Sequence, residues 1–223
     1  MTSRSSPPDL NLELNFWNAR LERIAGMDEA GRGALAGPVV AAAVILPPVP
    51  SLVQAFAGVR DSKQMTPRQR DAWAPRIQEA AVGWGVGFAS SQEIDTLGIV
   101  AATRLAAARA FKSLPFIPDA LLLDFRLGLP ENPLPQVELV KGDQRSLSIA
   151  AASVLAKTAR DARMRELEVK YPGYGFAQHK GYGTRLHREA IWRMGRCEIH
   201  RKTFSMVTTP VPVAGRANAE RFW

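Results

Sequence analysis

One stretch, Gly26 to Gly37, constrains the fold of this chain more than any other. Apolar residues flank it on both sides, and they predict strands over residues 23–27 and 39–46. The link between these strands is short, so we expect them to be antiparallel neighbours in one sheet. Side chains in the link are therefore held at the end of a buried strand.

The link carries two acids, Asp28 and Glu29, followed by Gly31, Arg32 and Gly33. Carboxylates at the end of a core strand are costly to bury unless a cation neutralises them, and glycines let the backbone approach a ligand closely. Consecutive strand residues point to opposite faces, so we expect the strand to end between the two acids if they share one site. An Asp-Glu pair alone is typical of a solvated turn. The whole combination indicates metal-dependent chemistry on nucleic acid.

Composition favours one soluble domain that binds a polyanion. The 223 residues are 46% hydrophobic, which is enough for a sizeable core. The single cysteine, Cys197, suits a reducing cytosol, and residues 1–10 lack the apolar segment of a secretory signal, so we expect a cytoplasmic protein. The net charge is +8, and residues 141–204 hold 14 basic residues against 6 acidic ones. A positive field concentrated in one segment is typical of a nucleic-acid-binding surface.

Capping signals and apolar runs divide the rest of the chain. Thr66 to Gln69 and Ser90 to Glu93 each predict a capping box at the start of a helix. Further strands are expected over residues 82–89, 120–124 and 136–140. Helices are expected over residues 10–21, about 67–81, about 100–114, from Ser146 or Ser148 onward, and about 184–194.

Several other residues could take part in chemistry. Asp124 ends an apolar run, and acids at the ends of buried strands lie where active sites of α/β proteins cluster. Lys157 and Asp161 have i,i+4 spacing, which by itself favours a plain surface ion pair, and Lys63 by itself is most simply a surface lysine. Residues 171–184 interleave glycines, aromatic residues and cations, a composition that suits stacking beside phosphates.

The string Met27 to Gly33, with Leu35 to Val44 after it, closely resembles the opening motif of ribonuclease HII, the type 2 ribonuclease H family. The resemblance covers residues 23–204. It continues in the family's order through Asp61-Ser62-Lys63, the run ending at Asp124, Lys141 to Asp161, and Ile199 to Phe204. It departs at Gly98, where the family usually has Asn, and at Phe125-Arg126, where the acid is usually followed by Gly.

The resemblance implies an α/β, ribonuclease H-like fold: a mixed five-stranded sheet flanked by helices, with a small C-terminal helical part. It divides the chain into an N-terminal tail with a possible short helix (1–22), a catalytic domain (23–204) and a C-terminal tail (205–223). The implied activity is endonucleolytic: hydrolysis of the RNA strand of RNA–DNA hybrids, and cleavage 5′ of single ribonucleotides embedded in duplex DNA. The products would carry 3′-OH and 5′-phosphate ends. We expect a monomer that binds these nucleic acids, with no membrane and no obligate protein partner.

The same resemblance assigns roles to residues. It implies that four acids are catalytic and bind metal: Asp28, Glu29, Asp124 and Asp161. Hard carboxylate oxygens suit Mg²⁺ or Mn²⁺ in a two-ion site, and not zinc. It also implies that Lys63 reaches a substrate phosphate and that Tyr174 stacks on a deoxyribose, with Tyr171 and Tyr182 as alternatives. We hypothesise that backbone groups of Gly31, Arg32 and Gly33 read the ribose 2′-OH.

Three alternatives remain open. A catalytically silent protein could bind nucleic acid through the basic C-terminal third, but it would gain nothing by aiming carboxylates at phosphates. Ribonuclease HIII shares the fold and acids but carries an extra N-terminal domain, for which the residues before the first strand leave no room. An unrelated two-metal phosphatase would cleave phosphate monoesters. His179, His187 and His200 lack zinc-site spacing, and we expect them to be structural or to contact phosphate.

Overall fold

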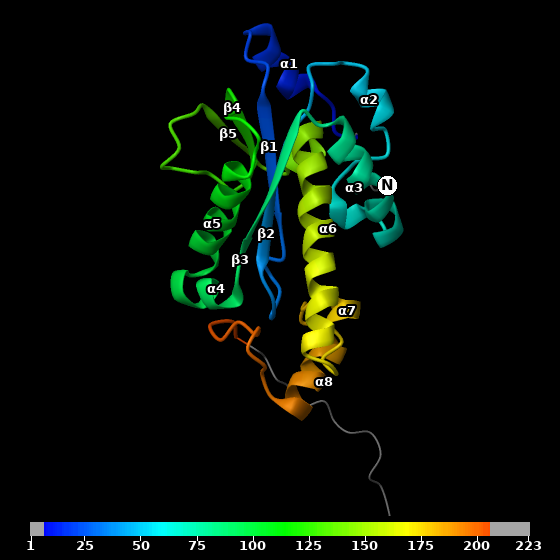
Figure 1. Ribbon diagram of the computed structural model, residues 1–223, viewed down its shortest axis with the longest axis vertical. Coiled ribbons are helices and arrows are strands. Elements are labelled where there is room, and N and C mark those ends of the chain that lie inside the picture. Colours follow the sequence, from blue (N-terminus) through cyan, green and yellow to red (C-terminus); the bar gives the residue numbers. More distant parts are fainter. Residues whose placement is uncertain (1–6, 206–223) are drawn as a thin grey trace, which may run out of the picture.

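The computed structural model describes residues 7–205, which form one five-stranded sheet with helices on both faces (Figure 1). The strands are β1 (Ile24–Ala30), β2 (Val39–Ile45), β3 (Gly83–Ala89), β4 (Ala120–Asp124) and β5 (Gln136–Leu139). The helices are α1 (Asn11–Asn18), α2 (Leu52–Ala55), α3 (Pro67–Ala80), α4 (Ser91–Leu97), α5 (Ile99–Lys112), α6 (Leu147–Lys170), α7 (Phe176–His179) and α8 (Arg185–Met194), with two short 3₁₀ helices, η1 (Ser62–Gln64) and η2 (Gly142–Gln144).

The sheet has the order β3-β2-β1-β4-β5. β1 and β2 are antiparallel, as are β2 and β3, whereas β4 runs parallel to both β1 and β5. The mixed five-stranded sheet and the antiparallel first pair are therefore confirmed. The central strand β2 is buried along its whole length, in keeping with its unbroken apolar sequence.

The capping residues in the sequence predicted most helix ends correctly. Both expected capping boxes, at Thr66 and at Ser90, are present. Ser146 caps the long helix α6, because its hydroxyl accepts a hydrogen bond from the Ile149 N–H. Gly98 ends α4 with a φ of +78°. With a ψ of 157°, this backbone conformation is essentially restricted to glycine, so it favours Gly98 over the Asn that the family usually has here.

Helices α3 and α6 cover one face of the sheet and α5 covers the other (Figure 1), and each face has its own core cluster. On one face, Val44 of β2 packs in a cluster with Val154 of α6 and Ile77 of α3. On the other face, Met27 of β1 packs in a cluster with Ala106 of α5. A Cβ atom at Gly26 would lie 2.3 Å from the Ser148 carbonyl carbon, so only glycine lets the start of α6 approach β1 this closely.

The N-terminal segment belongs to this packing. The expected short helix is present as α1, and the Leu147 N–H donates to the Asp9 carbonyl at 2.8 Å. Glu13 of α1 is buried, and its Oε1 accepts bonds from both serine hydroxyls at the start of α6, Ser146 and Ser148, each at 2.6 Å. A third bond to Glu13 Oε1 comes from the Ser148 N–H at 3.0 Å. A carboxylate is well placed at a helix N-terminus, where backbone N–H groups lack partners.

Glu13→Ala is expected to lower the free energy of unfolding by about 3 kcal/mol, because it leaves three buried donors without their charged acceptor. Urea denaturation followed by circular dichroism measures this change. Glu22→Ala, which alters an exposed glutamate beyond the same helix, is the control and should stay within about 0.5 kcal/mol of wild type. Equal unfolding free energies for the two variants would show that Glu13 does not anchor α6.

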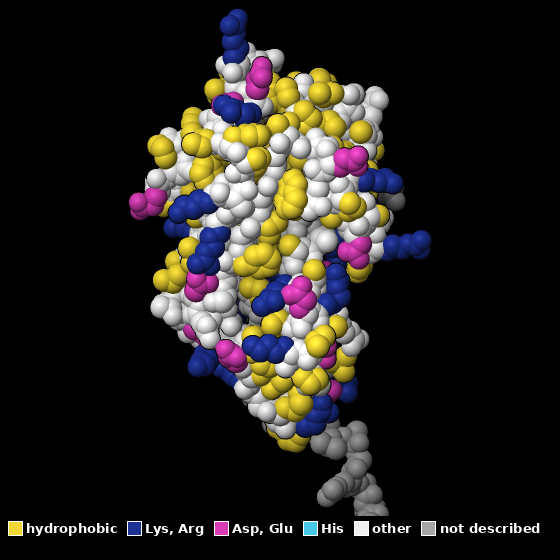
Figure 2. All heavy atoms as spheres, in the orientation of Figure 1, with side chains coloured by type: hydrophobic (Ala, Val, Ile, Leu, Met, Phe, Trp, Pro, Cys, Tyr) yellow, Lys and Arg dark blue, Asp and Glu magenta, His cyan; other side chains and the backbone are white. Residues whose placement is uncertain are grey.

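The face shown in Figure 2 carries hydrophobic side chains along its middle, in the region of the edge strand β3 in Figure 1. Trp84 and Phe88 of this strand are 39% and 38% exposed. Basic and acidic side chains are interspersed around these hydrophobic residues (Figure 2).

None of the helices in the described residues combines the length and apolar character needed to cross a membrane.

Candidate active site

Three predicted acids meet at the end of the parallel pair β1 and β4. One carboxylate oxygen each from Asp28, Glu29 and Asp124 can be chosen so that all lie within 4.8 Å of one another. The expected end of the strand between Asp28 and Glu29 is wrong, because β1 continues to Ala30 and stays paired with β2 up to that residue. Pairing between β1 and β4 instead stops at Met27, one residue before the acids, so β1 is free of its parallel neighbour there. The departure at Phe125 leaves Asp124 in this cluster.

The acidic cluster has the properties of a cation site. Asp28 is 2% exposed, and among the described residues its Oδ2 and the Glu29 Oε2 are buried without a hydrogen-bond donor. Burial raises the pKa of Asp28 well above its usual range, and the neighbouring carboxylates of Glu29 and Asp124 raise it further. Burial also raises the pKa of Glu29, although Arg32 opposes that rise. Hard, orphaned oxygens that repel one another fit a divalent metal ion.

Asp143, which the sequence argument did not single out, lies beside this cluster. It is 4% exposed in η2, and the preceding Gly142 donates its N–H to Asp124 Oδ1 at 2.8 Å. Burial raises the pKa of Asp143 to about 7, and the carboxylates of Asp61 and Asp124 contribute to the rise. A signal was present in the sequence: Asp143 closely follows strand β5, as Asp124 ends β4.

Asp161 lies elsewhere on α6. Its Oδ1 accepts from Lys157 Nζ at 2.6 Å and its Oδ2 from Arg70 Nη2 at 3.1 Å. Ser153 is the α6 residue whose hydroxyl faces Asp28, and Asp161 is eight residues, or about 12 Å, further along the helix. The structure thus does not bring Asp161 to the other acids, and the i,i+4 ion pair that its spacing favoured is present.

Lys63 lies among the acids. Partial burial lowers its pKa, but Asp28, Asp61 and Asp143 raise it more, and the net shift is upward. The turn that carries Lys63 is fixed to α6, because the Ser153 hydroxyl donates to the Ser62 hydroxyl at 2.8 Å. The position of Lys63 next to the cluster is compatible with contact to a substrate phosphate.

The Gly31-Arg32-Gly33 turn adjoins the acids. Arg32 Nη1 lies 3.7 Å from Glu29 Oε1, so the turn and the acidic cluster are in direct contact. Gly31 has a φ of +91°, a left-handed conformation that favours glycine, whereas a Cβ at Gly33 would meet open space. The backbone of Gly33 is therefore accessible to a ligand beside the acids.

Tyr174 does not present its ring to a ligand. It is 8% exposed, it stacks on Phe176 with ring centroids 5.2 Å apart, and its hydroxyl donates to the Gly195 carbonyl at 3.0 Å. The proposed stacking role for Tyr174 conflicts with this burial in the small C-terminal core. Tyr182 is half-buried, and two cations lie over its ring: Lys157 Nζ at 5.4 Å and the Arg160 guanidinium at 5.2 Å.

The three histidines form a buried network next to Tyr182. The Cys197 N–H donates to His200 Nδ1 at 2.9 Å, so the proton of His200 is on Nε2. That Nε2–H donates to His187 Nε2 at 3.1 Å, and the His187 Nδ1–H then donates to the Tyr182 carbonyl at 3.0 Å. These bonds require neutral rings, and they give His187 and His200 a structural role, one of the two roles that we expected for the histidines.

The His187 ring is expected to stay neutral down to about pH 4, because burial and then His179 and His200 lower its pKa to about 4. The unfolded state takes up the proton near pH 6.5, so this contribution to stability is full above pH 6.5 and falls by about 3 kcal/mol as the pH drops to 4. An NMR titration of the imidazole signals, assigned with His187→Gln, tests this. A midpoint near 6.5 for His187 would contradict the network.

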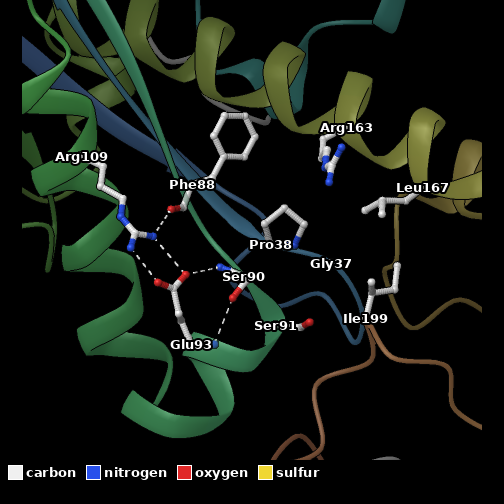
Figure 3. A pocket seen from close by; sticks show the side chains of 10 residues that line it. All are labelled: Gly37, Pro38, Phe88, Ser90, Ser91, Glu93, Arg109, Arg163, Leu167 and Ile199. Atoms are coloured by element: carbon white, nitrogen blue, oxygen red, sulfur yellow. Dashed lines mark hydrogen bonds and ion pairs between the residues drawn. The ribbon is translucent and has the colours of Figure 1, made fainter. Parts of the chain in front are cut away.

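A separate cleft of about 560 Å³ lies on the side of β3 (Figure 3). Glu93 and Arg109 form a 2.7 Å ion pair on one side of it, and Arg163 of α6 lies on the other (Figure 3). Its lining residues are Gly37, Pro38, Phe88, Ser90, Ser91, Glu93, Arg109, Arg163, Leu167 and Ile199. None of the clustered acids lines it, so it is distinct from the candidate metal site.

A mixed sheet of this order, with carboxylates where two neighbouring parallel strands end, defines a metal-dependent nuclease of the ribonuclease H type. The family model of ribonuclease HII matches residues 25–207. Ribonuclease HII of Syntrophotalea carbinolica is 53% identical over 182 residues, covering 82% of this chain and 85% of that protein. The chain belongs to the ribonuclease HII family, and it is a metal-dependent hydrolase that acts on RNA–DNA hybrids.

Solved structures agree with this assignment. The crystal structure of ribonuclease H2 from Pyrococcus horikoshii matches with a TM-score of 0.65 at 25% identity, covering 82% of this chain and 93% of that one. Bst-RNase HIII, solved in complex with Mn²⁺, has the same fold with a TM-score of 0.61 at 22% identity, covering 78% of this chain and 63% of that one.

Proposed function

We propose that this chain hydrolyses the RNA strand of hybrids and also cuts duplex DNA on the 5′ side of a single embedded ribonucleotide, leaving 3′-OH and 5′-phosphate ends. One observation carries the proposal: the Gly31-Arg32-Gly33 turn touches the acidic cluster through Arg32 and Glu29. A backbone that reads a 2′-OH at this place would select the sugar whose phosphodiester lies at the acids.

The residues that would hold Mg²⁺ or Mn²⁺ are Asp28, Glu29 and Asp124, with Asp143 as the fourth acid in place of Asp161. When bound, a pair of such ions would supply an activated water and stabilise the leaving 3′-oxygen. The protein orients Asp124 through the Gly142 N–H and Asp28 through the Glu29 N–H, at 2.8 and 2.7 Å. Lys63 supplies a positive charge beside the acids for a phosphate of the substrate.

We expect substrate contacts beside the cluster, where Gly33 is exposed and Arg32 is half-buried. The backbone of Gly31, Arg32 and Gly33 would contact the ribose. The half-exposed ring of Tyr182, and not the buried ring of Tyr174, would stack on the neighbouring sugar.

The proposal is tested with a labelled DNA duplex that contains one ribonucleotide, alongside a continuous hybrid and an all-DNA duplex. We expect cleavage 5′ of the ribonucleotide with Mg²⁺ or Mn²⁺ and none with EDTA. DNA polymerase should extend the upstream product, which shows its 3′-OH end. Binding without cleavage of either substrate would favour a silent nucleic-acid-binding protein, and cleavage of the hybrid alone would exclude single-ribonucleotide recognition by the turn.

A further inference from the structure

Two arginines from distant parts of the chain are buried together behind the segment 31–38. Arg160 of α6 is 0% exposed, and Arg201, beyond α8, is 1% exposed. Among the described residues neither lies within 4.0 Å of a carboxylate oxygen. Burying a cation without an acid is costly, so the groups that solvate these two guanidiniums determine what they do.

Each guanidinium is solvated by three backbone carbonyls. Arg201 donates to Gly31, Arg32 and Gly37, at 2.7, 2.8 and 3.1 Å. Arg160 donates to Pro38, Lys180 and Ala36, at 2.9, 2.9 and 3.2 Å. Five of these six carbonyls belong to the segment that includes the Gly31-Arg32-Gly33 turn. The sixth, that of Lys180, lies two residues before Tyr182.

Arg160 touches both proposed substrate contacts at once. A Cβ atom at Gly31 would lie 1.8 Å from Arg160 Nε, so the turn rests directly on the guanidinium. The same guanidinium lies 5.2 Å from the centre of the Tyr182 ring. Backbone bonds from Leu35 and Ala36 to the Gly181 carbonyl, at 2.8 and 3.3 Å, reinforce the junction. One side chain therefore sets the spacing between the turn and the ring.

Only arginine fits this role. Its planar fork carries five N–H donors in fixed directions, whereas the three donors of lysine all leave one rotating nitrogen and cannot reach carbonyls spread around a planar group. We propose that Arg160 and Arg201 are positioning residues that fix the turn and the Tyr182 ring relative to each other. A ribonucleotide bound to the turn and the next sugar stacked on the ring are then held in a fixed position relative to the acids. This inference rests on the proposed function.

The test compares Arg160→Lys and Arg201→Lys with wild type on two substrates, the single-ribonucleotide duplex and the continuous hybrid. Every nucleotide in the RNA strand of a hybrid carries a 2′-OH, so cleavage of the hybrid depends less on the distance between the turn and the Tyr182 ring. We expect kcat/KM on the single ribonucleotide to fall at least tenfold more than kcat/KM on the hybrid. Arg163→Lys, an exposed change on the same helix, should keep the wild-type ratio. A purely structural role would lower both rates equally, and that result would overturn the inference.

A second variant decides the matter if the arginine variants do not fold. Tyr182→Ala removes a half-exposed ring and leaves both buried arginines in place. It should lower the ratio of single-ribonucleotide to hybrid cleavage at least tenfold. An unchanged ratio would show that the ring and the turn do not bind the single-ribonucleotide substrate together, which overturns the inference. A wild-type enzyme that cuts only hybrids would instead overturn the proposed function.

Discussion

Asp28→Asn is expected to abolish metal-dependent cleavage while the fold and the binding of hybrids persist. Asp28 is the most deeply buried acid of the cluster, and its Oδ2 has no donor among the described residues. Removing one charged ligand forfeits several kcal/mol of transition-state stabilisation, which corresponds to a loss of roughly a thousandfold or more in kcat. Single-turnover cleavage of a labelled hybrid measures the loss. A variant with the wild-type rate would show that Asp28 holds no catalytic ion.

The same variant should be more stable than wild type in EDTA. The folded-state pKa of Asp28 is raised, so its carboxylate disfavours folding at every pH above its ordinary pKa, and the neutral amide removes that penalty. Mg²⁺ should raise the Tm of wild type more than that of Asp28→Asn, because an ion that binds only the folded state stabilises it. Thermal melts in EDTA and in MgCl₂ provide both comparisons.

Asp143→Asn is expected to lose activity, whereas Asp161→Asn is expected to lose stability. Asp143→Asn should lose at least about a hundredfold in kcat with little loss of stability, because this acid adjoins Asp124 in the cluster. Asp161→Asn should keep the kcat of its folded fraction. It should lose about 3 kcal/mol of unfolding free energy, since it leaves Arg70 and Lys157 without their charged partner.

Paired measurements of kcat and urea unfolding separate the two acids. The Asp161 side chain is 7% exposed, so its ion pairs are too buried to behave as weak surface contacts. Loss of kcat in Asp161→Asn at unchanged stability would restore Asp161 as the fourth catalytic acid. It would also show that the working enzyme rearranges α6 relative to the cluster.

Sequence reasoning was most successful where the information is local. Apolar runs and capping residues gave the strands and helix starts, because these features depend on a few neighbouring residues. The resemblance gave the sheet type. The resemblance implied that Asp28, Glu29 and Asp124 share a site, and they meet because Asp28 and Glu29 follow the last residue of β1 that pairs with β4 and Asp124 ends β4.

The differences between prediction and structure concern distances along an element and contacts between distant segments. Helical spacing shows which face Asp161 occupies, but it does not show how far along α6 the site lies. The burial of Tyr174 depends on packing against Phe176 and on the Gly195 carbonyl, which the spacing of aromatic residues does not reveal. Likewise, part of the positive charge counted toward a binding surface lies inside the protein, since Arg160 and Arg201 are buried.

The central claim is that Asp28, Glu29, Asp124 and Asp143 hold the catalytic metal. Anomalous diffraction from crystals of the wild-type protein soaked in Mn²⁺ tests it most directly. The account predicts anomalous density among these four carboxylates, with Lys157 and Arg70 still paired to Asp161. Density at Asp161, with none at Asp28 and Glu29, would contradict it.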